Sequence, residues 1–264
     1  MNASAKQPIG IFDSGIGGTS IWKEIHSLLP NEQTIYLSDS KNAPYGQKSR
    51  QEILNLSIKN TEFLIQHNCK LIVVACNTAT TNAIHYLRQH YPIPFIGIEP
   101  AIKPASILTK SKKIGILATK GTLNSSLFEK TSSKINQEVQ IIEQIGEGLV
   151  ELIENNQINS NEMHQLLLKY LEPMLKENVD CLVLGCTHYP YLIPKIKEIV
   201  GENLQIIDSG EAVARQTKNV LTKQSLLNTS TYKKENIFYI NKEKQILEQI
   251  LLDYPEVIIN EKDF

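Results

Sequence analysis

Residues 71–78 read LIVVACNT, and residues 181–188 read CLVLGCTH, so one short pattern occurs twice in the chain. In both segments a run of mostly branched apolar residues stops at a small residue, and Cys76 or Cys186 follows it, 110 residues apart. Such a run is typical of a buried strand in a parallel sheet. Open α/β sheets build their sites at the carboxyl ends of strands. The two segments therefore predict one pocket with a thiol on each side.

The similarity between the two halves extends beyond the cysteines. Residues 9–15 resemble residues 114–120 at an offset of 105, and residues 98–99 match residues 207–208 at an offset of 109. Chance similarity between apolar runs is the alternative explanation. Three matched strand ends at nearly constant spacing favour a duplicated architecture.

Strand and helix patterns alternate along the chain, which predicts βαβ units and mostly parallel sheets of the α/β class. We expect strands near residues 9–12, 34–37, 71–75, 94–98, 114–118, 139–142, 181–185 and 204–207, and helices near residues 18–28, 49–67, 78–90, 124–135, 147–155, 161–177, 190–200 and 210–222. The repeat places a first domain at residues 1–97 plus 208–264 and a second at residues 98–207. The tail, with a strand at 237–240 and a helix at 242–253, is too small for a core of its own and is expected to return to the first domain.

Composition excludes several classes of protein. The 264 residues are 41% hydrophobic and 21% charged with a net charge of −1, so no broad attraction to nucleic acid or to an anionic membrane is expected. No apolar run reaches the roughly 20 residues that a membrane span needs, and residues 1–8 lack the apolar centre of a signal peptide. We therefore expect a cytoplasmic protein with four reduced cysteines. Their spacing does not fit a metal site.

The two matched thiols are placed for acid–base chemistry. Cys76 and Cys186 each precede a predicted helix, and a helix N-terminus favours the thiolate. Two such groups that face each other suit proton transfer at a stereocentre, because one removes a proton from Cα and the other delivers a proton to the opposite face. Asn77, Thr78 and Thr187 lie beside the thiols and are suited to hold the carboxylate and the amine of the reacting molecule.

Simple packing is the alternative for every cysteine, since a cysteine at a strand end is often only a small buried residue. The matched polar contexts of Cys76 and Cys186 favour function over packing. Cys69 and Cys181 lie at strand beginnings, away from the expected site, and are interpreted as packing residues.

Several motifs together resemble the cofactor-independent aspartate/glutamate racemase family, and in particular its glutamate racemases. They occur in the family's order, and the pairing of the glycine-rich motif with CTHYP is highly specific. The matching segments are DSGIGG at 13–18, PYG at 44–46, ACNTAT at 75–80, GIEPA at 97–101, GT at 121–122 and LGCTHYP at 184–190.

The resemblance implies two similar parallel-sheet domains related by a pseudo-two-fold axis, with the substrate between them. It implies inversion of glutamate by two bases with no cofactor and no metal, to supply D-glutamate for peptidoglycan, and it is compatible with a homodimer. Cys76 and Cys186 would transfer the protons, with Asp13 and His188 as helpers. The substrate site would be lined by Asp13, Ser14, Pro44, Tyr45, Gly46, Asn77, Thr78, Thr119, Thr122, Thr187 and His188.

The chemistry of the helpers is consistent with these roles. Asp13 ends a predicted strand and begins a glycine-rich turn that a ligand can approach closely, although a helix N-cap is the alternative. His188 can stabilise a thiolate or carry its proton, with a core histidine as the alternative. The family also places a carboxylate after a Leu-Val segment, where both Glu151 and Glu154 fit and Glu154 fits the register better; a solvated helix face is the alternative.

The match also has departures, and other functions remain in competition. Phe128 stands where the family usually has tyrosine, residues 146–148 lack a common proline, and residues 238–241 lack the usual Thr-Gly. The rivals are a racemase of aspartate or a related acid, a non-catalytic protein that binds an acidic amino acid or a protein partner, and a thiol redox enzyme. The glycine turn lacks the full spacing of a dinucleotide site. No CxxC pair supports redox chemistry.

Overall fold

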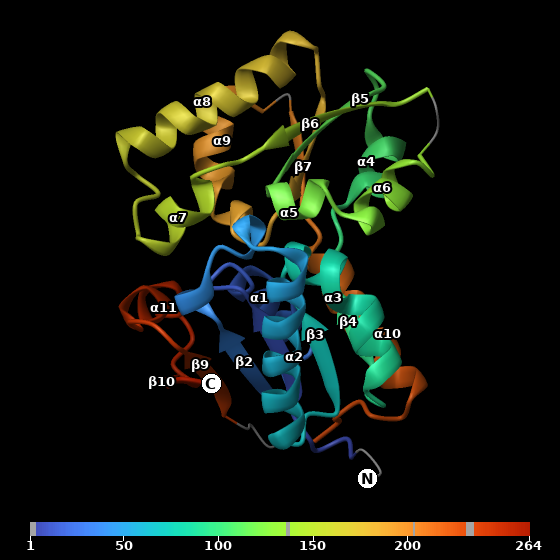
Figure 1. Cartoon of the computed structure of the whole chain (residues 1–264), viewed down its shortest axis with the longest axis vertical. Helices are drawn as coiled ribbons and strands as arrows, with labels where there is room; N and C mark the ends of the chain where they lie inside the picture. Colours follow the sequence, from blue (N-terminus) through green and yellow to red (C-terminus); the bar gives the residue numbers. More distant parts are fainter. Residues whose placement is uncertain (1–3, 136–137, 203, 231–234) are drawn as a thin grey trace.

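The computed structural model of the chain describes residues 4–135, 138–202, 204–230 and 235–264. The chain forms two lobes, and each lobe is built on one parallel β-sheet with helices packed around it (Figure 1). The predicted α/β class is therefore confirmed. A pseudo-two-fold relation between the lobes stays a prediction.

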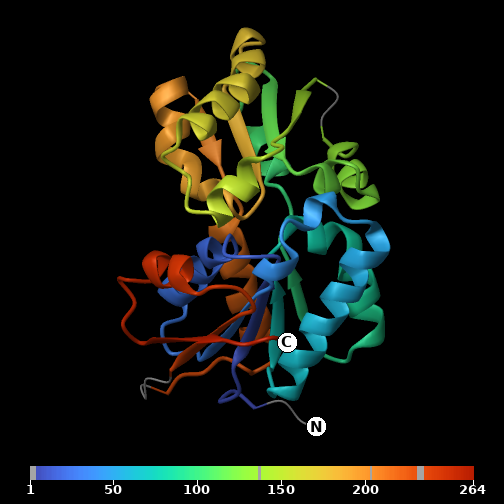
Figure 2. The same cartoon turned by 60° about the vertical axis from the view of Figure 1, so that its left-hand side comes forward.

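The first sheet combines the beginning and the end of the chain. Its order is β10-β9-β2-β1-β3-β4, and every neighbouring pair is parallel. The last two strands lie beside strands from the first half, and both termini lie in this lobe (Figure 2). Its strands are β1 (Ile9–Asp13), β2 (Thr34–Ser38), β3 (Leu71–Val74), β4 (Phe95–Gly97), β9 (Asn236–Ile240) and β10 (Val257–Glu261).

The second sheet is contiguous in sequence and has the order β6-β5-β7-β8. Its strands are β5 (Lys113–Ala118), β6 (Gln140–Ile145), β7 (Cys181–Gly185) and β8 (Gln205–Ile207). The domain boundaries at residues 97/98 and 207/208 stay a prediction. Each lies in a segment that joins strands of different sheets.

Four strands in each sheet follow the same order, because β2-β1-β3-β4 corresponds to β6-β5-β7-β8. In each sheet the second strand lies on one side of the first strand and the third lies on the other side. This reversal creates a topological switch point between β1 and β3 and another between β5 and β7. Ligands of open α/β sheets bind at such points. Cys76 follows β3 and Cys186 follows β7, so each thiol lies at a switch point.

Most helices follow the strands that the apolar runs predict. Those around the first sheet are α1 (Thr19–Leu28), α2 (Arg50–Gln66), α3 (Asn77–His90), α10 (Gly210–Lys223) and α11 (Gln245–Ile250), with the 3₁₀ turns η1 (Ser40–Asn42) and η2 (Tyr45–Gln47). The others are α4 (Ile102–Leu108), α5 (Lys120–Leu123), α6 (Ser126–Ser132), α7 (Leu149–Glu154), α8 (Asn161–Lys176), the 3₁₀ turn η3 (Tyr189–Leu192) and α9 (Ile193–Val200).

The structure differs from the prediction in three places. The expected helix at 124–135 shortens to α6, which begins after Ser125 accepts a hydrogen bond from the Phe128 N–H, and the short helix α5 before it was not predicted. The expected helix at 242–253 shortens to α11. Helix α4 and strand β10 have no counterpart among the elements that the sequence predicts.

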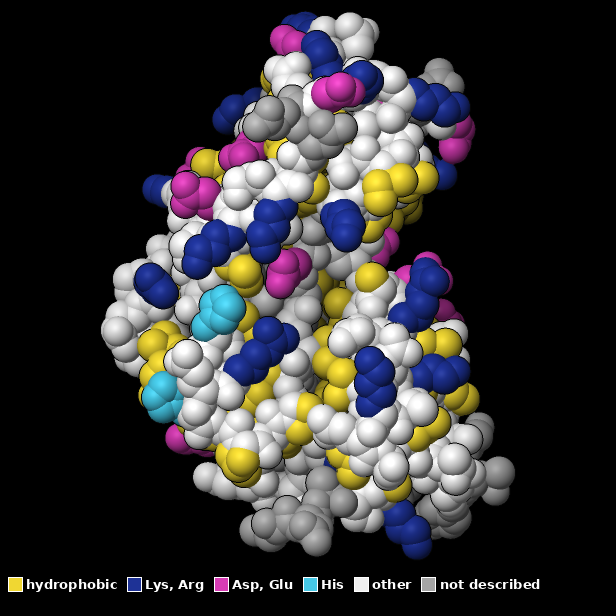
Figure 3. All heavy atoms as spheres, turned by 90° about the vertical axis from the view of Figure 1, so that its right-hand side faces the viewer, with side chains coloured by type: hydrophobic (Ala, Val, Ile, Leu, Met, Phe, Trp, Pro, Cys, Tyr) yellow, Lys and Arg dark blue, Asp and Glu magenta, His cyan; other side chains and the backbone are white. Residues whose placement is uncertain are grey.

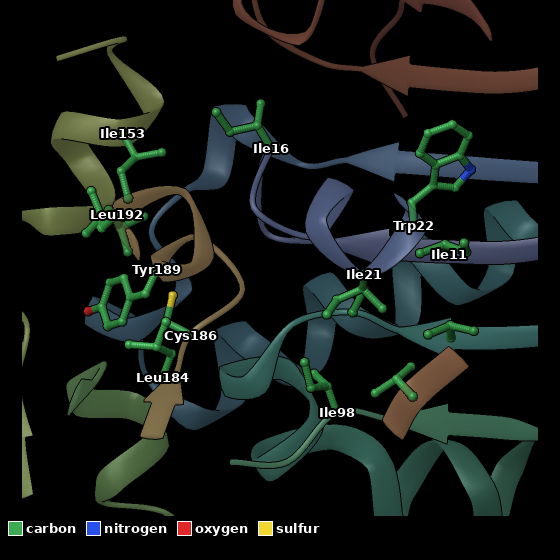
Figure 4. Packing of buried hydrophobic residues seen from close by; sticks show 14 of the residues in the cluster. Ile11, Ile16, Ile21, Trp22, Ile98, Ile153, Leu184, Cys186, Tyr189 and Leu192 are labelled. Atoms are coloured by element: carbon green, nitrogen blue, oxygen red, sulfur yellow. The ribbon is translucent and has the colours of Figure 1, made fainter. Parts of the chain in front are cut away.

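An apolar interface joins the lobes. One buried apolar cluster includes Ile16 and Ile21 from the first lobe and Ile153, Tyr189 and Leu192 from the second (Figure 4). Burial of apolar surface on both sides stabilises this contact. The two lobes are therefore packed against each other beside the ends of the strands that carry the thiols.

Basic and acidic residues nearly balance over the whole chain, with a net charge of −1. Basic and acidic side chains are interspersed on the face in Figure 3. Among the described residues, no helix has both the length and the apolar character needed to cross a bilayer.

Candidate active site

Both thiols line one cavity between the lobes, which contains about 250 Å³ of space between atoms, open solvent at its mouth included. Every lining residue except Val150 is among the predicted site residues. Asp13, Thr122 and Glu154 are also predicted site residues and do not line this cavity. The lining consists of Ser14, Pro44, Tyr45, Gly46, Cys76, Asn77, Thr78, Thr119, Val150, Cys186, Thr187 and His188.

Cys76 is the N-cap residue of α3. Its sulfur accepts a hydrogen bond from the Ala79 N–H at 3.4 Å and lies 3.6 Å from Ser14 Oγ, to which the thiol can donate. Burial raises the pKa of this thiol, the Asp13 carboxylate raises it further, and the Ala79 and Ser14 contacts oppose both effects without overcoming them. The sequence predicts a thiol whose ionised form the helix favours. The structure corrects this expectation, because the complete burial of Cys76 outweighs the helix.

Cys186 has a different neighbour. It lies three residues before η3, and its sulfur is 3.7 Å from Nδ1 of His188. Nε2 of His188 lies 2.6 Å from Oε1 of Glu154. Burial by itself lowers the pKa of His188, but the hydrogen bonds and charges of Cys186 and Glu154 outweigh it and hold this pKa well above its usual value. The raised pKa favours the imidazolium form of this buried His188, whose ring nitrogens lie beside a sulfur and a carboxylate.

Asp13 organises the glycine turn that follows β1. One carboxylate oxygen accepts hydrogen bonds from the N–H groups of Gly15 and Gly18, at 3.2 and 2.9 Å, and the other accepts one from the Thr187 hydroxyl at 3.3 Å. Burial raises the pKa of Asp13, and the nearby His188 opposes that rise. Gly18 is the N-cap residue of α1, so Asp13 does not have the helix-capping role that was the alternative interpretation.

The glycine turn itself contacts the second lobe. A Cβ atom at Gly15 would lie 1.9 Å from Oε1 of Glu154, and one at Gly17 would lie 2.3 Å from Nδ1 of His188. No side chain larger than hydrogen fits at either position with these neighbours in place. The glycines therefore allow the backbone of the first lobe to approach Glu154 and His188 of the second lobe.

Glu154 lies at the end of α7, and its carboxylate receives donors from the other lobe. Oε1 accepts the Ile16 N–H at 2.7 Å, and Oε2 accepts the Ser40 hydroxyl at 2.9 Å. Of the two carboxylates that the sequence left open, Glu154 contacts His188, whereas Glu151 forms a hydrogen bond with Gln47 near the surface.

Ser40 and Val150 were missed in the sequence. Ser40 follows the carboxyl end of the strand at 34–38, so the strand-end rule that singled out Cys76 and Cys186 would have found it. Val150 belongs to the Leu-Val segment that served only as a marker for the carboxylate. An apolar residue in an amphipathic helix carries no separate signal of a site.

Polar groups suited to a small acidic ligand surround the thiols. The hydroxyl groups of Thr78, Thr119 and Thr122 are mutual hydrogen-bonding neighbours at 2.8 to 3.3 Å, with Thr122 behind the cavity wall. Asn77 lines the cavity, and its buried Oδ1 atom has no hydrogen-bond partner among the described residues. Such an acceptor needs a donor, and a ligand ammonium group is suited to that role.

The predicted loop at Pro44–Gly46 reaches the cavity as part of η2. The Tyr45 hydroxyl donates to the buried carboxylate of Asp39 and also accepts from Asn60 at 3.2 Å. A Cβ atom at Gly46 would lie 2.8 Å from Cβ of Thr119, so the loop also closes against the second lobe. This arrangement fixes the loop as one wall of the cavity.

The other two cysteines do not line the cavity. Cys69 packs in an apolar cluster of the first lobe, and Cys181 is the first residue of β7. Burial raises the pKa of Cys69 to about 12 and that of Cys181 to about 11. All four cysteines are free, and no group of three or more metal-binding side chains occurs among the described residues.

Comparison with known proteins decides the family. Residues 9–217 match the family model of the Asp/Glu/hydantoin racemases. The chain belongs to this family. The span that matches this racemase model contains both thiol segments and the glycine turn, and it ends before β9 and β10.

Individual members of the racemase family resemble the chain over most of its length. A glutamate racemase of Herpetosiphon aurantiacus is 45% identical over 225 residues, which are 85% of this chain and 89% of that protein. The crystal structure of a glutamate racemase isoform from Bacillus anthracis superposes with a TM-score of 0.87 at 32% identity and covers 98% of both chains. The glutamate racemase of Francisella tularensis in complex with D-glutamate gives a TM-score of 0.84 at 29% identity, over 98% of this chain and 97% of that one.

Proposed function

We propose that this protein is a glutamate racemase that interconverts L- and D-glutamate by proton transfer between two thiols. The observation that carries the proposal is the single cavity that Cys76 and Cys186 both line, one from each lobe. The similar proteins named above are glutamate racemases, and the one from Francisella tularensis was crystallised with D-glutamate.

The reaction needs one base and one acid on opposite faces of Cα. A thiolate takes the Cα proton as the C–H bond breaks, and the electron pair remains on the substrate as a carbanion. The opposite thiol then gives its proton to Cα, which forms the new C–H bond with inverted geometry. At the end the two sulfur atoms have exchanged their protonation states. Atoms and charges balance with no redox step, and the reverse reaction uses the same two groups in exchanged roles.

The surroundings of the two thiols suit the two roles. Burial and the Asp13 charge keep Cys76 in its neutral form, which can donate a proton. His188 holds a proton beside Cys186 and can donate a hydrogen bond to a thiolate there. A neutral thiol on one side and a hydrogen-bond donor for a thiolate on the other are the surroundings that the first half-reaction requires.

Glutamate would be held by neutral dipoles rather than by lysine or arginine, since neither residue lines the cavity. The first N–H groups of α3 have no partner within the helix, and such groups bind carboxylates. The hydroxyl groups of Thr78, Thr119 and Thr187 are further donors, and the Asn77 amide oxygen can accept from the ammonium group. We therefore assign these residues, with Ser14 and the 44–46 loop, to substrate binding.

The proposed cellular role rests on the family resemblance. D-glutamate is a component of peptidoglycan, so the enzyme would supply cell-wall synthesis. We also propose a cytoplasmic location, where four free thiols stay reduced. A homodimer remains a further proposal, for which sedimentation of the purified protein is the test.

The decisive experiment is incubation of the purified protein with L-glutamate in deuterated water and no added cofactor. We expect optical rotation to decay to zero and deuterium to appear at Cα. A protein that only binds the amino acid would do neither, and a thiol redox enzyme would consume an oxidant or a reductant instead. L-aspartate in a parallel reaction tests the rival substrate, and faster racemisation of aspartate would overturn the assignment to glutamate.

A further inference from the structure

The carboxylate of Glu154 is one of the groups that connect the two lobes. Glu154 belongs to α7 of the second lobe. Its partner His188 and the thiol of Cys186 belong to the same lobe, because both residues follow β7. Both additional hydrogen bonds to this carboxylate come from the first lobe, one from the Ile16 N–H and one from the Ser40 hydroxyl. The charge beside His188 is therefore held in place by groups of the opposite lobe.

Ser40 reaches Glu154 without reaching the reacting atoms. It is the first residue of η1, directly after β2 and Asp39, and only 5% of its surface is exposed. It does not line the cavity that contains Cys76 and Cys186. Its hydroxyl donates to Oε2 of Glu154, while Oε1 of the same carboxylate faces His188. Any effect of Ser40 on the chemistry must therefore pass through Glu154.

The hydrogen bond from Ser40 has a clear electrostatic consequence. A carboxylate that accepts further hydrogen bonds keeps its negative charge and its orientation in a buried site. That charge favours the protonated form of His188, whose second N–H group faces the sulfur of Cys186. Loss of the Ser40 hydroxyl would leave Oε2 of a buried carboxylate without this donor, which allows the carboxylate to turn away from His188.

We infer that Ser40 is a positioning residue that couples the contact between the lobes to proton transfer at Cys186. This inference rests on the proposed racemase function. The Ser40 hydroxyl fixes Glu154 against His188 only while the two lobes are in contact, so the His188–Cys186 pair is complete only in that arrangement. On the Cys76 side, the contacts of the thiol with Ser14 and Ala79 lie within the first lobe, and the contact between the lobes is the hydrogen bond that the Thr187 hydroxyl donates to Asp13.

The test compares Ser40→Ala with three related variants. Ser40→Thr keeps the hydroxyl, and Ser40→Cys keeps the size but has only a weak donor. Ser38→Ala is the matched control, because the Ser38 hydroxyl contacts Ser40 at 3.0 Å but no contact joins it to Glu154. Thermal unfolding of each variant establishes that the protein is folded before its kinetics are measured.

The readout is kcat and KM for each enantiomer, with hydrogen or deuterium at Cα. We expect Ser40→Ala to lower kcat about tenfold, the effect of one hydrogen bond to a charged group, with KM changed less than about twofold because no cavity residue is altered. Ser40→Thr should restore the rate, Ser40→Cys should be intermediate, and Ser38→Ala should behave as the unaltered enzyme.

Isotope effects distinguish a positioning role from a general loss of structure. If transfer at Cys186 is slowed, the primary isotope effect should increase for the enantiomer whose proton Cys186 removes. The primary isotope effect should decrease for the other enantiomer. Cys76 removes the proton of that enantiomer, and this step then precedes the slower proton transfer at Cys186. A general structural defect would lower activity without this opposite movement.

Equal changes in the primary isotope effects of the two enantiomers, or an unchanged rate in Ser40→Ala, would overturn the inference, as would a Ser38→Ala variant that behaves like Ser40→Ala. The unaltered protein is measured in the same assay. If it fails to racemise glutamate, the proposed function fails, whereas an active enzyme that is indifferent to Ser40 overturns only the role of Ser40.

Discussion

The two halves of the site place similar thiols in different surroundings. Cys76 lies at the start of a long helix with a carboxylate nearby, and burial keeps its proton in place. Cys186 has an imidazolium beside it, which is itself paired with Glu154. Duplicated strands therefore deliver two equivalent sulfur atoms, while residues that differ between the matched segments, such as Asp13 and His188, give the two thiols different neighbours. The proposed reaction is symmetric, but the two thiols that carry it out lie in different surroundings.

The largest effect is expected when either thiol of the Cys76–Cys186 pair is removed. Cys76→Ser and Cys186→Ser should each lower racemisation by about 10³-fold or more, because a serine hydroxyl is a far weaker acid and base than a thiol. Polarimetry with each enantiomer measures the loss. Each variant should still exchange the Cα proton of one enantiomer with solvent deuterium, and the exchanged enantiomer identifies the face that the remaining thiol serves. Wild-type turnover in both single variants would rule out the two-thiol mechanism.

The next comparison removes one charged helper from each side. His188→Asn and Asp13→Asn should each lower kcat by about 10²-fold, within the range for groups that assist proton transfer. Because His188 contacts the sulfur of Cys186 and not that of Cys76, the two variants should shift the primary isotope effects of the two enantiomers in opposite directions. Identical isotope effects in both variants would contradict the division of the site into two environments.

A smaller effect on rate, and a distinct effect on pH dependence, are expected for Glu154→Gln. Without the Glu154 charge, burial lowers the pKa of His188, so the imidazole should lose its proton at a lower pH and the alkaline limb of the kcat profile should move to lower pH. The raised pKa of His188 contributes stability that is complete below its unfolded value of 6.5 and is lost as pH rises through the folded pKa.

The same substitution therefore has a predicted stability signature. Glu154→Gln should destabilise the protein more at about pH 6 than at about pH 9, as thermal unfolding at the two pH values can measure. Glu151→Gln serves as the control, since Glu151 lies in the same helix but its carboxylate contacts Gln47 rather than His188. A pH profile of Glu154→Gln that coincides with that of the unaltered enzyme would show that His188 does not depend on this carboxylate.

The smallest effect concerns the two cysteines outside the cavity. Cys69→Ala and Cys181→Ala should leave kcat within about twofold and lower the free energy of unfolding by about 1 kcal/mol, as expected for removal of one buried heavy atom. Activity and thermal unfolding of the two variants check this. A large loss of activity in either variant would extend the functional thiols beyond the matched pair.

The ends of the buried strands were the most predictable part of the fold. An apolar run followed by a small residue and polar groups has few alternatives, which is why the sequence alone places the residues around Cys76 and Cys186 correctly. Elements with weaker patterns were missed. Helix α4 is only seven residues long and contains Pro104, and β10 is an edge strand with no fully buried position.

The site was predictable as a set of residues but not as a set of contacts. The position of Glu154 between Ile16, Ser40 and His188 depends on how two lobes pack, and the first two are more than 100 residues from it in sequence. The ionisation of Cys76 was predicted in the wrong direction, because the sequence indicates the helix start but not the extent of burial. Local sequence patterns identify the residues of the site, whereas burial and long-range contacts determine the ionisation of those residues.

The place of β9 and β10 has a consequence for biosynthesis. The second sheet lies within residues 113–207, so a nascent chain can complete it early, but the first sheet lacks two strands until residues 236–261 have left the ribosome. The lobe that is translated first is therefore the one that is finished last. A premature stop codon in the tail would yield a chain that retains both thiols yet has an unfinished lobe beside a finished one, with the apolar flank of β2 open to aggregation.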